Sequence, residues 1–403
     1  MTLSRSALAA ALVLAIGPLP LALAQQEKAR AEPPRRGQAP GFNYRSIEVG
    51  PDHKVTFRIR APKASEVSVL GDFGRAKMEK NDEGVWSATV GPLEPDYYTY
   101  HFDVDGVFTV DPRNPMIKPG LGSVDSMCLV SGPESEFEQT KHVPHGQVRT
   151  DWYNSKTLGD QRSLRVYTPP GYEKGSERYP VFYLLHGAGD NDEGWSTVGR
   201  AGFILDNRIA EKKAVPMIVV MPNGSLPRPS RPNGDAQANG QGQGQNPDDR
   251  RAMMQAMQQR FTHELLDDIV PFVEANYRTL GGAEHRALAG LSMGGGQTLQ
   301  VLTSRPDAFG YVGIWSAGIF GGSPGEFEES HAAFFKDAAR VNDTVKLLSI
   351  SVGDKDFLFE GSKAIDALFT KHGIRHELHV SGGGHTWINW RHYLGELTPR
   401  LFR

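Results

Sequence analysis

The 403-residue sequence is poor in cysteine, in net charge and in long apolar runs. A single cysteine, Cys128, excludes both an intrachain disulfide and a cysteine-rich metal site. The net charge is only −3, so the basic surface that nucleic-acid binding needs is absent and we expect no nucleic-acid partner. Beyond the N-terminal segment no stretch reaches the roughly 18 apolar residues of a membrane span. In contrast, 45 glycines and 27 prolines predict long and numerous loops.

The N-terminus has the pattern of an export signal. Arg5 supplies a positive charge, the apolar run Ala7–Leu23 is interrupted by Pro18, and Ala22–Ala24 offers a small-residue cleavage site. We therefore expect residues 1–24 to be a signal peptide and the mature chain to be free of the membrane. Secretion without disulfides is ordinary for a bacterial protein, so we expect a secreted or periplasmic location in a bacterium.

The next part of the chain changes from a polar linker to short strands. Residues 25–42 are polar and proline-rich, which is typical of a linker. Residues 43–130 show period-two alternation, and Asp105–Gly106 has the composition of a hairpin turn. This pattern predicts a small all-β sandwich. Residues 131–147, rich in Glu and Pro, are expected to be a second linker, so the sandwich should be separable from the C-terminal part of the chain.

The aromatic residues of this predicted sandwich allow two interpretations. Phe73, Trp86, Tyr97 and Tyr98 could stack on sugars or could form the core of the module. Alternating aromatic residues in a small β-domain are more often core residues, so structural support is favoured over glycan binding.

Residues 148–403 alternate strand and helix patterns. Short apolar runs such as Val181–Leu185 and Ala287–Leu291 are separated by helical periodicity, which predicts an α/β fold with a mostly parallel central sheet covered on both faces. Residues 225–260 fit neither pattern because they are of low complexity. They are expected to be either a disordered surface insertion or a mobile loop over the active site.

The strongest chemical signal is the motif G-x-S-x-G at Gly290–Gly294. It follows an apolar strand and precedes a helical pattern, which is the context of a nucleophile elbow. The chain must turn so sharply at Ser292 that side chains on either flank would clash, and this explains the two glycines. Ser292 is therefore the expected nucleophile, at the N-terminus of a helix that favours negative charge.

A serine hydroxyl needs a base, and the base needs an orienting acid. His385 follows the last predicted strand, where the base of an α/β-hydrolase lies in chain order, and we expect it to be the base. The loop after the strand Leu347–Val352 offers Asp354 and Asp356. Spacing slightly favours Asp356, because it lies further out on the loop.

Two backbone N–H groups should stabilise the tetrahedral oxyanion. One is expected from Met293, directly after the nucleophile, and the other from the loop that comes after Val181–Leu185. That loop begins with His186 and Gly187, and we expect the N–H of Ala188 to be the donor, with Gly187 as the alternative. The zinc-protease and phosphate-loop patterns fail, so no metal and no organic cofactor are expected.

These segments together resemble carbohydrate esterase family 1. The nucleophile region Glu284–Gln297, the strand and loop Phe182–Gly187, and Gly382–Trp387 are similar to motifs of that family, which includes feruloyl and acetylxylan esterases. The resemblance covers about residues 148–402. It implies an α/β-hydrolase fold, and because the family's acid is the last residue of a G-x-x-D motif, it selects Asp356. It also implies substrate contacts from three residues, namely Gly187, Trp195 and Trp387.

The region 43–130 resembles the early-set, glycogen-binding-like module of such esterases. Together with the expected export signal, the resemblance of residues 148–402 implies an exported serine esterase that removes feruloyl or similar acyl groups from plant polysaccharide or oligosaccharide. Deacetylation of xylan is the nearest alternative, followed by hydrolysis of an enterochelin-type siderophore. A glycan-binding protein with an idle hydrolase domain is the alternative from another class. The acyl group, the sugar and the oligomeric state stay open.

Overall fold

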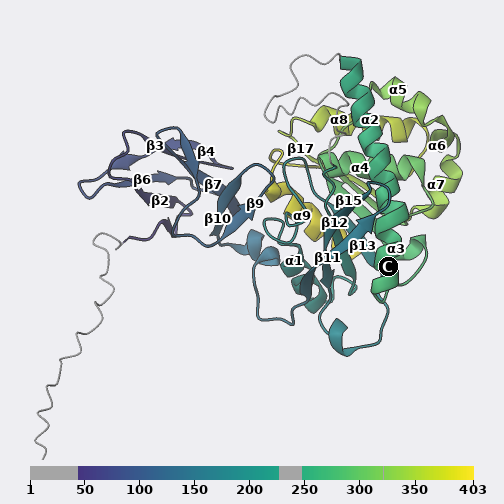
Figure 1. Ribbon diagram of the computed structural model, residues 1–403, viewed down its shortest axis with the longest axis horizontal. Helices are drawn as coiled ribbons and strands as arrows, with labels where there is room; N and C mark the ends of the chain where they lie inside the picture. Colours follow the sequence, from purple (N-terminus) through teal and green to yellow (C-terminus); the bar gives the residue numbers. More distant parts are fainter. Residues whose placement is uncertain (1–43, 227–246, 321) are drawn as a thin grey trace, which may run out of the picture. The chain divides into compact units, whose positions relative to one another are not determined.

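The structure, a computed structural model, describes residues 44–226, 247–320 and 322–403 (Figure 1). The expected signal peptide (1–24), the linker (25–42) and the larger part of the expected insertion lie outside the described residues. No helix in the described part of the chain is long and apolar enough to cross a bilayer.

The N-terminal module is a β-sandwich, and all its strand pairs are antiparallel. One sheet has the order β1 (Ile47–Val49), β2 (Val55–Arg60), β6 (Val85–Val90), β5 (Glu79–Lys80). The other has the order β4 (Gly74–Lys77), β3 (Val67–Gly71), β7 (Asp96–Val104), β10 (Val124–Val130), β9 (Ile117–Pro119), with β8 (Val107–Thr109) beside β7.

The core of the sandwich is explained by the period-two pattern of its strands. In β2 the apolar residues Val55, Phe57 and Ile59 are buried, whereas the polar residues between them face outward. Phe57 stacks on Phe73 and contacts Tyr100 from the facing sheet. Trp86 and Tyr98 are also buried in this core and Tyr97 is buried against the C-terminal domain, so these aromatic side chains are core residues. Burial also raises the pKa of the lone Cys128 thiol to about 12, which keeps it protonated.

The C-terminal domain is built on an eight-stranded sheet. Its order is β11 (Gln147–Ser155), β12 (Asp160–Thr168), β14 (Ile218–Pro222), β13 (Val181–Leu185), β15 (Arg286–Leu291), β16 (Tyr311–Trp315), β17 (Leu347–Gly353), β18 (Glu377–Ser381). Strands β11 and β12 pair antiparallel, and β12 is antiparallel to β14, whereas the remaining strands are parallel. The predicted α/β fold with a mostly parallel sheet is therefore confirmed.

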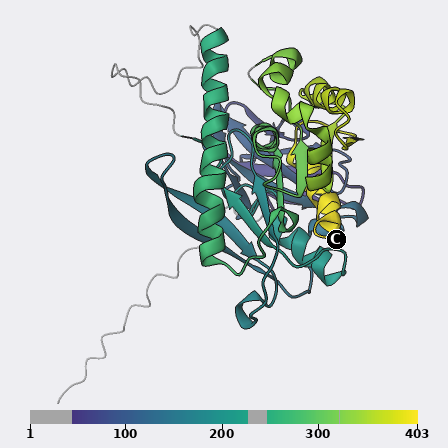
Figure 2. The same ribbon diagram turned by 90° about the vertical axis from the view of Figure 1, so that its right-hand side faces the viewer.

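Helices cover both faces of this sheet (Figures 1 and 2). They are α1 (Ala201–Ala210), α2 (Pro247–His263), α3 (Val270–Asn276), α4 (Met293–Ser304), α5 (Pro324–Ser330), α6 (Ala332–Lys336), α7 (Ala338–Thr344), α8 (Phe359–Lys371) and α9 (Trp387–Leu397), with a π-helical segment η3 (Glu264–Ile269) between α2 and α3. Short 3-10 turns are η1 (Pro133–Glu138), η2 (Tyr172–Lys174), η4 (Ala283–His285) and η5 (Thr398–Arg400).

The central strand β13 shows how the sheet divides the core into two layers. Val181, Tyr183 and Leu185 join the cluster under α2, α4 and α8, whereas Phe182 and Leu184 join the cluster under α1 and α9. A strand that is apolar at every position thus serves both faces, as expected for a buried parallel strand.

Two parts of the predicted organisation are wrong. The expected insertion 225–260 ends in ordered structure, because residues from Pro247 onward belong to helix α2. Figure 2 shows the green helical run from α2 to α3 along one face of the sheet. The expected linker 131–147 is packed, since it contains η1 and the fully buried side chains Ser135 and Glu138.

The sandwich and the C-terminal domain share a core, which the prediction of a separable module did not anticipate. Tyr97 and Met127 of the sandwich belong to the same buried cluster as residues of α1 and α9. In the other direction, Ile388 of α9 packs against the core of the sandwich. Removing the sandwich would therefore expose apolar surface of both units to water.

A buried ion cluster lies at this junction. Arg391 of α9 is 0% exposed and donates to the Asp96 carboxylate and to the Tyr97 carbonyl of the sandwich. Its Nε lies 2.7 Å from Glu138 Oε2, and His392 Nε2 lies 3.1 Å from Asp96 Oδ2. Burial alone would raise the pKa of Asp96, but the Arg391 charge and the His392 hydrogen bond outweigh it and lower the pKa. The carboxylate is therefore ionised and tied to α9.

We expect Arg391→Met to lower the free energy of unfolding by about 3–5 kcal/mol, because it removes the buried guanidinium that contacts both Asp96 and Glu138. Arg400→Met is the matched control, since Arg400 pairs with Glu377 at the surface and its loss should cost less than about 1 kcal/mol. Urea unfolding of both variants measures the difference. Equal destabilisation by the two substitutions would contradict the structural role given to the buried cluster.

Candidate active site

The expected nucleophile lies in a strained turn between β15 and α4. Ser292 has φ 52° and ψ −114°, which is unfavourable for any residue except glycine. The turn is held by a 2.9 Å bond from Ser292 N–H to the Trp315 carbonyl. A Cβ at Gly290 would lie 2.3 Å from the Gly294 carbonyl, and one at Gly294 would lie 2.6 Å from the His186 carbonyl. Both glycines of the motif are therefore sterically required.

The expected acid and base are in direct contact. Both carboxylate oxygens of Asp356 lie 3.0 Å from His385 Nδ1. Burial would raise the pKa of Asp356, but the hydrogen bonds from His385 and from the Leu358 N–H outweigh it, so the pKa is lowered. The ionised carboxylate accepts from Nδ1–H, which leaves Nε2 of His385 to exchange protons with a bound group.

Asp354, the other aspartate of this loop, holds the backbone of the neighbouring loop and does not contact His385 in the described structure. Its carboxylate accepts from the Gly383 N–H at 3.0 Å, and the Gly383 carbonyl accepts from the Lys355 N–H at 2.9 Å. These bonds join the loop after β17 to the loop after β18. A Cβ at Gly353 would lie 2.3 Å from the Gly383 carbonyl, so this close approach requires glycine. The two loops together bring Asp356 to His385.

Three residues that the sequence interpretation missed surround this pair. The Trp390 ring packs edge-on against His385, and its Nε1 donates to the Ser316 hydroxyl at 2.9 Å. Phe357 covers the His385 ring at a centroid distance of 4.3 Å and is itself 76% exposed. The sequence does place a phenylalanine directly after the expected acid, but its exposure is visible only in the structure.

The loop after β13 lies beside the nucleophile. A Cβ at Gly187 would lie 3.4 Å from the Ser292 Cβ, so this glycine lets backbone approach the hydroxyl. In the described part of the chain no backbone carbonyl accepts from the N–H of Ala188 or of Met293. Both expected oxyanion donors thus remain available to a ligand at the carboxyl edge of the sheet.

His186 sets the direction of the Ala188 N–H. Its Nδ1 lies 2.8 Å from the Gly187 carbonyl, and its Nε2 accepts from the Gly224 N–H at 2.9 Å. Burial lowers the pKa of His186, which favours the neutral ring that these two bonds need. Because a peptide unit is planar and trans, a Gly187 carbonyl held against His186 points the Ala188 N–H the opposite way.

Trp195 and Trp387 do not have the exposure that substrate contact requires. Trp195 is 1% exposed, and its indole N–H donates to the Leu185 carbonyl at 3.0 Å. Trp387 packs edge-to-face against it at 5.0 Å and is also buried. The two rings pack beneath the start of the loop after β13, so a structural role fits them better than substrate contact. Of the three expected substrate contacts, Gly187 lies beside Ser292, whereas the two indole rings are buried.

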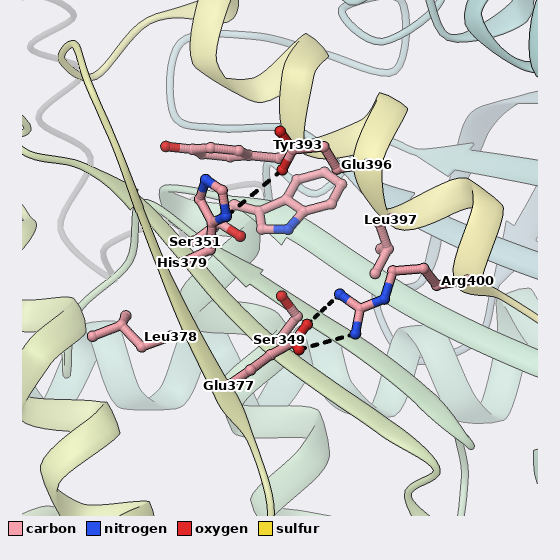
Figure 3. A pocket seen from close by; sticks show the side chains of 10 residues that line it. Ser349, Ser351, Glu377, Leu378, His379, Tyr393, Glu396, Leu397 and Arg400 are labelled. Atoms are coloured by element: carbon pink, nitrogen blue, oxygen red, sulfur yellow. Dashed lines mark hydrogen bonds and ion pairs between the residues drawn. The ribbon is translucent and has the colours of Figure 1, made fainter.

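A pocket also lies elsewhere in the C-terminal domain, between β17, β18 and α9 (Figure 3). Ser349, Tyr393 and Leu397 line it, and surface ion pairs such as Glu377–Arg400 flank it. None of the expected catalytic residues belongs to this pocket. Among the described residues, no group of three or more His, Cys, Asp or Glu side chains is arranged to hold a metal ion.

A serine elbow after β15, a carboxylate after β17 and a histidine after β18 on a mostly parallel sheet form the layout of an α/β-hydrolase. Comparison with known families agrees with this class. The family described as "Putative esterase" matches residues 155–401, and the chain belongs to this family. Carbohydrate-binding module 48, described also as the isoamylase N-terminal domain, matches residues 41–115. The resemblance to carbohydrate esterases with an N-terminal β-module is thereby confirmed.

Similar proteins carry related names. An "Endo-1,4-beta-xylanase/feruloyl esterase" of Xylanibacter ruminicola is 30% identical over 90% of this chain, which spans 46% of that relative's length. A solved "ferulic acid esterase" is 27% identical, with a TM-score of 0.52 over 64% of this chain and 99% of that one. The enterobactin esterase FES of Shigella flexneri shares the fold, with 18% identity and a TM-score of 0.61 over 87% of this chain and 94% of its own.

We expect Asp356→Asn to be far more damaging than Asp354→Asn. The amide keeps the size of the carboxylate but favours the wrong tautomer of His385, a loss of about 10⁴ in kcat for the corresponding change in serine proteases. Asp354→Asn retains an oxygen that can accept from Gly383 N–H, so its effect should be small. Steady-state kinetics on p-nitrophenyl acetate measure both variants, and a greater loss from Asp354→Asn would reverse the assignment.

Proposed function

We propose that this protein is a serine esterase that hydrolyses feruloyl or closely related aryl esters on plant cell-wall polysaccharide. The observation that carries the proposal is the 3.0 Å contact between Asp356 and His385 at the sheet edge where the strained Ser292 turn also opens. A hydroxyl after β15, an ionised carboxylate after β17 and an imidazole after β18 fit acyl transfer through a covalent intermediate.

The proposed reaction has two steps. Ser292 Oγ attacks the ester carbonyl while His385 Nε2 takes its proton, and the N–H groups of Met293 and Ala188 stabilise the oxyanion. The tetrahedral intermediate collapses, the C–O bond to the sugar breaks, and the leaving alcohol receives the proton from His385. Water then repeats the sequence on the acyl-enzyme, again with His385 as base, and releases the carboxylic acid.

The substrate class is supported by Phe357 and by the comparisons. Phe357 presents an exposed aromatic face beside His385, which suits an aryl acyl group. The relatives with names of feruloyl or ferulic acid esterases and the match to a carbohydrate-binding module favour an aryl ester on a polysaccharide. Export of the enzyme, with cleavage after Ala24, fits a polymeric substrate outside the cell.

The proposal is tested by measuring the products of the 403-residue protein. We expect ferulate release from methyl ferulate and from feruloylated arabinoxylan, and a loss on the order of 10⁶ in kcat for Ser292→Ala, at an unchanged melting temperature. Release of acetate from acetylated xylan without any release of ferulate would overturn the feruloyl assignment. Undiminished turnover by the purified Ser292→Ala protein would overturn the mechanism.

We expect Phe357→Ala to raise the ratio of KM for methyl ferulate to KM for p-nitrophenyl acetate about two- to tenfold, the value of a lost aromatic contact. The ratio is used because any disturbance of His385 affects both substrates alike. Phe108→Ala is the control, since Phe108 is also an exposed phenylalanine that packs on a histidine, His101, but lies in the sandwich. If the ratio of the two KM values is the same in Phe357→Ala and Phe108→Ala, Phe357 does not bind the aryl group.

A further inference from the structure

The sandwich contacts the loop that carries the proposed oxyanion donor. The turn between β9 and β10 brings the Leu121 N–H to 2.8 Å from the Gly189 carbonyl, directly after Ala188. A Cβ at Gly120 would lie 3.0 Å from the same carbonyl, closer than side-chain carbons normally pack. The glycine therefore allows the two backbones to meet.

An ion pair reinforces this contact. Asp190, two residues after Ala188, is buried, and its Oδ1 has no hydrogen-bond partner in the described structure. Lys118 Nζ of β9 lies 3.3 Å from this oxygen and 3.9 Å from Asp125 Oδ2. A buried carboxylate is costly unless a cation compensates it, so Lys118 stabilises the loop in this position.

The loop is thus held from two sides. On the inner side His186 and the Asp190 N–H, at 3.3 Å, both approach the Gly187 carbonyl. On the outer side Leu121 holds the Gly189 carbonyl and Lys118 holds the Asp190 carboxylate. The peptide unit that bears the Ala188 N–H lies between these attachments, so its direction depends on both.

We propose that Lys118 and the β9–β10 turn of the sandwich are positioning elements of the active site, which fix the Ala188 N–H for the oxyanion. The proposal rests on the serine esterase function proposed for this site. It assigns the N-terminal module a part in catalysis that does not involve sugar binding, and this part therefore extends to small soluble esters.

The expected consequence of Lys118→Met is a loss of kcat. Removing an oxyanion donor costs about 10²–10³ in kcat, and a misdirected donor should cost part of this, about 10- to 100-fold. KM for p-nitrophenyl acetate should change little, because the donor acts on the transition state. Lys118→Arg, which keeps the charge, should restore most of the activity.

The experiment compares Lys118→Met and Lys118→Arg with Lys63→Met, which removes an exposed lysine of the same module. Rates are expressed per active serine, counted with a fluorophosphonate probe, so that misfolded protein does not enter kcat. Inhibition by phenylboronic acid, which forms a tetrahedral adduct with the serine, supplies a second readout. Its Ki should rise by about the factor by which kcat falls, whereas Lys63→Met should change neither.

A double variant, Lys118→Met with Asp190→Asn, separates the effect on catalysis from an effect on folding, because it removes both partners of the ion pair and leaves no unpaired Asp190 carboxylate. It should keep the loss in kcat even where its melting temperature recovers. Wild-type kcat and Ki in this double variant would overturn the proposal, as would a Lys118→Met protein that loses only its active fraction.

Failure of the underlying function gives a different result. It would appear as a wild-type protein that hydrolyses no ester or keeps its activity after Ser292→Ala. Such a result would overturn the positioning role together with the esterase. A wild-type esterase with a fully active Lys118→Met variant would overturn the positioning role alone.

Discussion

The interaction on which the rest of the structure depends is the buried contact of Arg391 with Asp96 and Glu138. It joins three segments that are far apart in the sequence. They are β7 of the sandwich, the connection 131–147 that follows the sandwich, and α9. Helix α9 begins two residues after His385, so its placement also sets where the loop after β18 ends. One guanidinium group therefore couples the arrangement of the modules to the geometry of the candidate base.

Around this fixed helix the site is assembled almost entirely from loops at the carboxyl ends of β13, β15, β17 and β18. Hydrogen bonds from backbone N–H groups hold these loops in place. Ser292 N–H donates to the Trp315 carbonyl of β16, and Gly383 N–H donates to the Asp354 carboxylate. In such a site neighbouring backbone segments lie very close together, and this is why positions 187, 290 and 353 are glycines. The strain at Ser292 persists because these surrounding bonds determine the turn.

The elements that the sequence predicted well are those with a local physical cause. The elbow at Ser292 has steric rules that involve only its neighbours, and β13 is apolar over its whole length. The C-terminal end of the expected insertion was missed although Ala, Met, Gln and Arg between Pro247 and His263 are good helix formers. Glycine and proline in the preceding residues dominate the composition of the segment and conceal this helical end.

Other features depend on partners that no local pattern reveals. Nothing in the residues around Arg391 marks it as buried, and nothing near Lys118 points to Asp190, 72 positions away. The helices α5–α7 are short, from five to seven residues, so their periodicity is weak. The rings of Trp195 and Trp387, which were expected to contact substrate, are buried, and sequence alone cannot distinguish a ring at a surface from a ring beneath it.

The shared core at the junction has a consequence for protein engineering. Carbohydrate-binding modules are commonly treated as interchangeable cassettes that can be exchanged between enzymes at a linker. In this protein a crossover at residues 131–147 would separate Tyr97 and Met127 from the cluster they complete under α1 and α9. A functional chimaera would have to inherit Asp96 and Arg391 as a matched set, so recombination between relatives should preserve the two modules as one heritable unit.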